Sequence, residues 1–104
     1  MITVKLKKNS NRIKNITIIG HALYDDYGKD IVCAAVSSIS ILTINNIIKI
    51  DNEAISYSND NKLEINILKD NEIINILIDN LVNCLKELEH DYPKNITIKE
   101  DYNE

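Results

Sequence analysis

The chain has 104 residues, 44% of them hydrophobic and 27% charged, so it can form one domain with a single core and without disulfide or metal support. Its 16 Asp and Glu residues outnumber its 12 Lys and Arg residues, and the net charge of −4 argues against direct, sequence-independent binding of nucleic acid. An acidic surface suits a basic polypeptide partner better.

The cysteine content and the apolar runs set expectations about the cellular compartment. Cys33 and Cys84 fall on what we predict to be two different helices. No signal peptide opens the chain, and no apolar run approaches the roughly 18 residues of a membrane span. We therefore expect a cytoplasmic protein with both thiols reduced, without a membrane segment and without a cofactor.

The first half of the chain changes from an alternating to a helical pattern. Residues 1–7 and 14–19 alternate between apolar and polar side chains, which predicts two half-buried strands joined by a turn at residues 9–11. Gly20 ends the second strand. Residues 30–50 then have helical spacing with apolar side chains on nearly all faces, which predicts a helix packed on more than one side.

The second half repeats the same order of elements. The pattern predicts a hairpin of two strands at residues 53–58 and 62–68, followed by a helix at 70–89 and a last strand at 95–99. Asp70 is the expected N-cap of that helix, because its carboxylate can accept from free backbone N–H groups. The acidic segment 100–104 is expected to fray.

The predicted order of elements is ββαββαβ. Hairpins imply antiparallel pairing, and strands with one polar face imply that the helices cover only the other face. We therefore predict a single α+β domain over residues 1–104, a two-layer sandwich of a mainly antiparallel sheet with two helices on one face.

One segment combines the parts of a cysteine nucleophile. His21 follows the second strand, and Cys33 is expected in the first turn of the next helix, with Asp30 as its N-cap. A helix N-terminus favours a thiolate, an imidazole can hold the thiol proton, and free helix amides could stabilise an oxyanion. Ser37 would lie one turn beyond Cys33 on the same helix face.

Each of these residues also has a simpler interpretation. Cys33 could be buried and inert, and Asp30 could serve the helix only as a cap. Ser37 could be a small packing residue, and His21 could donate to a backbone carbonyl. Cys84 is best read as a packing residue. A metal site built from the histidine, the aspartate and the first cysteine matches no usual ligand spacing, so no metal is expected.

The same segment resembles the signature of the ribosomal-processing cysteine proteases of the Prp family. The residues that carry the resemblance are Gly20-His21-Ala22 and Gly28-Lys29-Asp30-Ile31-Val32-Cys33-Ala34-Ala35-Val36-Ser37. The opening Met-Ile-Thr-Val strand, the chain length and the order of elements agree with that family as well.

The resemblance implies an endopeptidase that removes the N-terminal extension of large-subunit ribosomal protein twenty-seven, cutting after bulky hydrophobic residues. It implies that His21 and Cys33 are catalytic and that Gly20, Asp30 and Ser37 support them. It also implies a homodimer and a loop at residues 21–29 that moves over the site. The alternatives are a non-catalytic binding module that assists ribosome assembly and a redox sensor in which the two cysteines pair.

Overall fold

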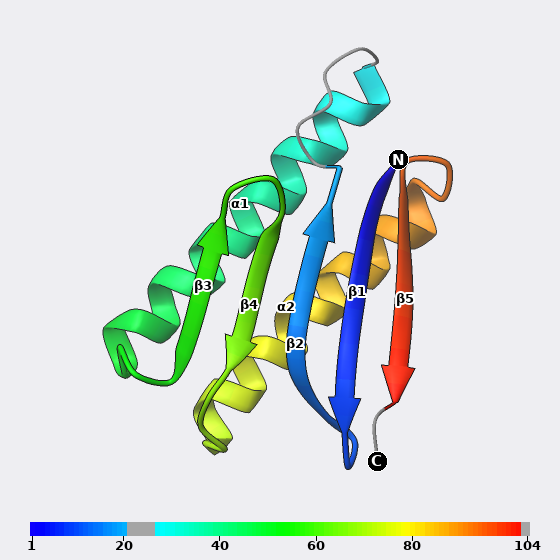
Figure 1. Ribbon diagram of the computed structural model, residues 1–104. Coiled ribbons are helices and arrows are strands. Elements are labelled where there is room, and N and C mark those ends of the chain that lie inside the picture. Colours follow the sequence, from blue (N-terminus) through cyan, green and yellow to red (C-terminus); the bar gives the residue numbers. More distant parts are fainter. Residues whose placement is uncertain (21–26, 103–104) are drawn as a thin grey trace.

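The chain forms a five-stranded sheet with two helices on one of its faces (Figure 1). The computed structural model describes residues 1–20 and 27–102. In chain order the elements are β1 (Ile2–Asn9), β2 (Arg12–Ile19), α1 (Tyr27–Ile50), β3 (Ile55–Asn59), β4 (Leu63–Ile67), α2 (Glu72–Asp91) and β5 (Ile96–Tyr102). The predicted ββαββαβ order and the two-layer α+β architecture are therefore confirmed.

The strands lie in the order β3-β4-β2-β1-β5. Three of the four pairings, β1 with β2, β2 with β4, and β3 with β4, are antiparallel. The fourth, between β1 and β5, is parallel, as the crossover through α2 permits. The sheet is thus mixed but mainly antiparallel, and β2 lies at its centre.

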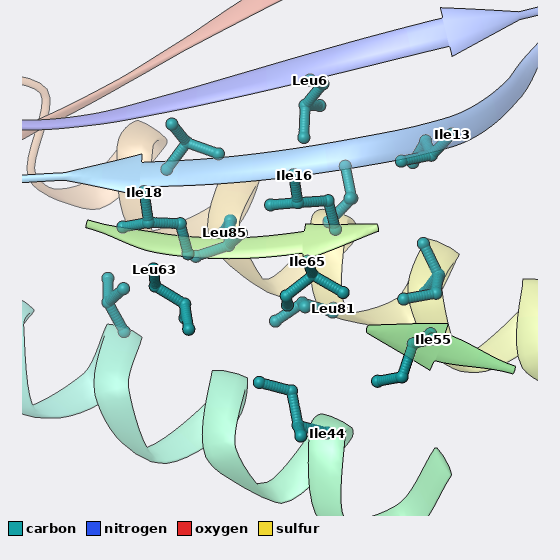
Figure 2. Packing of buried hydrophobic residues seen from close by; sticks show 14 of the residues in the cluster. Leu6, Ile13, Ile16, Ile18, Ile44, Ile55, Leu63, Ile65, Leu81 and Leu85 are labelled. Atoms are coloured by element: carbon teal, nitrogen blue, oxygen red, sulfur yellow. The ribbon is translucent and has the colours of Figure 1, made fainter. Parts of the chain in front are cut away.

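An aliphatic core fills the space between the sheet and the helices. Side chains from three neighbouring strands stack across the sheet, where Leu6 pairs with Ile16 and Ile16 with Ile65 (Figure 2). One apolar face of α2 packs against them, and its buried residues are Ile74, Ile78, Leu81, Val82 and Leu85. Burying one such side chain contributes about 1.5–3 kcal/mol, so this layer holds the domain together.

Helix α1 buries one face only. The buried residues follow at spacings of three and four and are Val32, Val36, Ser40, Ile44 and Ile47. Ile31, Ile41 and Leu42 are more than half exposed. The prediction that this helix packs on more than one side is therefore wrong for the single chain. By length and composition alone, the stretch Ile31–Ile50 is also long and apolar enough to cross a membrane. The expectation that no apolar run approaches the length of a membrane span is therefore wrong.

The second helix begins one residue later than predicted. Asn71, not Asp70, is the N-cap of α2, and its side-chain oxygen accepts from the backbone N–H groups of Ile73 and Ile74 at 2.9 and 3.2 Å. The Asp70 carboxylate instead accepts from the Asn75 side chain at 2.9 Å. Both residue types cap helices well, so the sequence alone did not distinguish the two neighbours.

The predicted fraying of residues 100–104 is wrong at the start of that segment, because β5 continues to Tyr102. The Glu100 carboxylate lies 3.1 Å from the Lys8 ammonium and 3.2 Å from the Lys86 ammonium. Hydrogen bonds from these two lysines lower the pKa of Glu100 below its usual value. This cluster ties β5 to β1 and α2.

Gly20 ends β2 in a conformation that suits glycine. Its φ is +87°, and a Cβ atom there would lie 2.7 Å from the carbonyl oxygen of Met1. Both the positive φ and the close approach of Met1 exclude a side chain at this position. The glycine therefore fixes the direction in which the chain leaves the sheet toward His21.

We predict that Gly20→Ala destabilises the fold by at least about 1–2 kcal/mol, because it adds left-handed strain and a backbone clash. Denaturant unfolding of the two variants in parallel measures the effect. The matched control is Gly28→Ala, at the other glycine of the chain, where the helical backbone of α1 accepts alanine without loss. Equal stability of the two variants would contradict the assignment.

Candidate active site

The candidate site lies at the end of β2 and the beginning of α1, which are consecutive elements of the chain. β2 delivers Gly20 at its end, and α1 carries Cys33 and Ser37. His21 lies outside the described residues, as does most of the loop 21–29. The structure therefore describes the cysteine side of the predicted pair.

The start of α1 corrects the predicted position of Cys33. The helix begins at Tyr27, so Cys33 is its seventh residue and lies in the second turn. Asp30 is the fourth helical residue and is not the N-cap, since an N-cap has a non-helical backbone. A carboxylate in the first turn is still favourable, because the helix dipole is positive there.

This shift changes the electrostatics expected at the thiol. Only the N–H groups of the N-cap and of the first three helical residues lack an internal partner, so in α1 none beyond residue 29 does. The amide of Cys33 lies beyond them, so the predicted oxyanion hole of free helix amides beside the thiol is wrong. The dipole effect also decays within the first turn. A nucleophilic role for Cys33 would therefore require a neighbouring base rather than the helix end alone.

The side chain of Cys33 is half-buried and packs against the hydrophobic core. Ser37 is half-buried one turn later, on the same side of α1. The predicted juxtaposition of these two residues on one helix face is confirmed. Packing against the core shields one side of this thiol from bulk water.

Cys84 lies on α2 and is also a half-buried free thiol. The two cysteines belong to different helices and are not joined. The structure thus offers no support for the redox interpretation.

The pKa shifts among the described residues come from hydrogen bonds and ion pairs at the surface. Lys69 donates to Asp51 at 2.9 Å, which lowers the pKa of the carboxyl and raises that of the ammonium. Asp51 lies 18 positions after Cys33, about 27 Å further along α1 and just beyond its last residue. These shifts belong to the opposite end of the helix and not to the candidate site.

Comparisons with known proteins agree with this geometry. The family described as cysteine protease Prp matches residues 1–97. A ribosomal processing cysteine protease Prp of Staphylococcus aureus is 30% identical, over 94% of this chain and 97% of its own length.

Two crystal structures of the protease Prp from S. aureus have the same fold. One, in complex with a substrate peptide, has a TM-score of 0.90 and 25% identity over 97% of this chain and 100% of its own. The other, in complex with a covalently linked product peptide, has a TM-score of 0.87 and 26% identity with the same coverage.

The fold and the comparisons together define a cysteine protease. The chain belongs to the cysteine protease Prp family, which confirms the resemblance read from the residues between Gly20 and Ser37.

Proposed function

We propose that this protease is an endopeptidase that removes the N-terminal extension of large-subunit ribosomal protein twenty-seven in the cytoplasm and so supports ribosome assembly. The carrying observation is the match of nearly the whole chain to a family whose S. aureus member is named a ribosomal processing protease. A relative with the same fold binds a substrate peptide in the crystal. The net charge of −4 suits the basic tail of a ribosomal protein.

In this proposal Cys33 is the nucleophile and His21 is the acid–base catalyst. The imidazole takes the thiol proton while the sulfur attacks the scissile carbonyl, and it then gives that proton to the departing amine as the C–N bond breaks. The product is a thioester between Cys33 and the N-terminal fragment. Water, deprotonated by His21, hydrolyses this thioester and restores the free thiol.

Gly20, Asp30 and Ser37 support the pair in distinct ways. Gly20 directs the chain from the end of β2 into His21, as its positive φ and its contact with Met1 require. Asp30 places a carboxylate in the first turn of α1, where it stabilises the helix that carries Cys33. Ser37 offers a hydroxyl one turn from the thiol, close enough to orient a bound peptide.

We predict that Cys33→Ala abolishes cleavage of a peptide that spans the extension and the junction of the ribosomal substrate, because it removes the sulfur that forms the thioester. Mass spectrometry of the products measures cleavage. Cys84→Ala is the matched control, since it removes the other half-buried thiol, and it should retain full activity. Undiminished cleavage by the Cys33 variant would refute the assignment of the nucleophile.

The alternative of a non-catalytic binding module predicts an unreactive Cys33. Labelling with iodoacetamide near neutral pH distinguishes the two proposals in proteins that keep one thiol each. A nucleophilic Cys33 should react at least about ten-fold faster in Cys84→Ser than Cys84 does in Cys33→Ser, because a neighbouring base raises the thiolate fraction. Equal slow rates from these two half-buried thiols would favour the binding module.

We also propose that the protein is a homodimer, with α1 of one copy facing α1 of the other. The exposed side of this helix carries a stripe of apolar and small residues at spacings of three and four, namely Ile31, Ala34, Ser38 and Leu42. Ile31 is 53% exposed and Leu42 is 60% exposed. A second copy would remove this apolar surface from water.

The dimer predicts that Leu42→Lys yields a monomer of 11.9 kDa, because a buried ammonium opposes association. Light scattering coupled to size-exclusion chromatography measures the mass. Ile76→Lys on α2 is the matched control, since Ile76 has the same 60% exposure, and it should remain dimeric. A wild-type protein that is already monomeric at working concentration would exclude this interface.

A further inference from the structure

An open hollow lies between α1 and the tip of the β3–β4 hairpin. In Figure 1 this hairpin lies beside α1, and Figure 2 shows Ile18 and Leu63 side by side on the helix-facing side of the sheet. The hollow is shallow: it offers about 30 Å³ of solvent-accessible space within an open volume of about 270 Å³. Its lining residues are Ile18, Val36, Ser37, Ile41, Asn59 and Leu63.

The hollow is adjacent to the candidate nucleophile along both elements that build the site. Ser37 lines it and lies four residues after Cys33, which is one helical turn or about 5–6 Å. Ile18 lines it as well, two residues before Gly20 on β2. A side chain of a peptide whose scissile carbonyl is at the thiol is therefore within reach of this opening.

The lining is apolar on its floor and walls. Val36 and Leu63 are only 1% and 6% exposed, and with Ile18 they close the bottom. Ile41 forms a wall that is 52% exposed, so part of this apolar surface still faces water. Asn59 supplies the polar group at the hairpin side. None of the described residues that line the hollow is charged.

We propose that this hollow binds one apolar side chain of the peptide substrate, and that Ile41, Asn59 and Leu63 determine which side chains fit. This inference rests on the proposed peptidase function and assigns its specificity to named residues. Burying an apolar side chain here would also cover the exposed wall of Ile41, which gives the interaction its free energy.

The distance along α1 limits which substrate residue is bound. An extended peptide advances about 3.3 Å per residue, and its side chains alternate between two sides. One helical turn from the thiol therefore corresponds to a side chain within two residues of the scissile bond. Leu63 at the floor sets the depth that this side chain can reach, and Asn59 at the hairpin tip sets its width.

The test is peptide binding in a Cys33→Ala background, where no turnover occurs. The probe is the synthetic peptide that spans the extension and the junction, with each residue within two positions of the scissile bond replaced by alanine in turn. In the Cys33→Ala protein, one of these alanine replacements in the peptide should raise Kd at least about ten-fold. In the double variant that also carries Ile41→Ala, the same replacement should raise Kd at most about three-fold. The difference between these ratios measures the coupling between the two side chains.

The matched control is Ile73→Ala, which makes the same substitution at a helical isoleucine that is 56% exposed on α2. It should keep the full ten-fold sensitivity. Ile41→Trp fills the hollow and should invert the preference, so that the alanine peptide binds better than the parent. Undiminished sensitivity in Ile41→Ala, or no binding of any peptide, would overturn the proposal.

Cleavage by the protein with Cys33 intact is scored separately. If peptide binding depends on Ile41 but no peptide is cut, the hollow is a binding site and the proposed peptidase function fails. If wild type and Ile41→Ala cut every peptide of the series with equal kcat/KM, the proposed peptidase function stands and the assignment of specificity to the hollow fails.

Discussion

The pairing of β2 on both of its edges is the constraint on which the rest of the structure depends. Ile18 pairs with Val4 on one side and with Leu63 on the other, so β1 and β4 together fix its register. A slip of one residue would turn every core side chain of β2 to the polar face. The position of Gly20, the exit toward His21 and the wall that Ile18 gives to the hollow all follow from this register.

The sequence predicted the order and type of the elements because the strands alternate cleanly and α2 has one apolar stripe. It failed at helix ends, where neighbouring residues have similar capping preferences. Asp30 can cap a helix, yet the helical backbone already starts at Tyr27. At the second helix the N-cap is Asn71 and not its neighbour Asp70. The candidate residues Cys33 and Ser37 lie one turn apart on the same helix, so local spacing alone places them together. The hollow was not, since its lining comes from segments that only the tertiary fold brings together.

Helix α1 shows why composition alone misjudged burial. Its apolar residues occur on nearly all faces, a pattern that fits a helix inside a core, a membrane span or a subunit contact equally well. Within this chain only the side with Val36 and Ile44 is covered. The opposite side carries the stripe around Leu42, and the flank with Ile41 opens to the hollow. One helix thus presents three surfaces with different environments.

The contact between Gly20 and Met1 has a practical consequence for anyone who modifies the protein. The carbonyl of Met1 lies against the residue that directs the chain to His21, so peptide added before Met1 would leave the sheet beside the candidate site. β5 ends at the opposite end of the neighbouring strand, because it runs parallel to β1. A purification tag or fluorescent fusion is therefore better attached after Glu104 than before Met1.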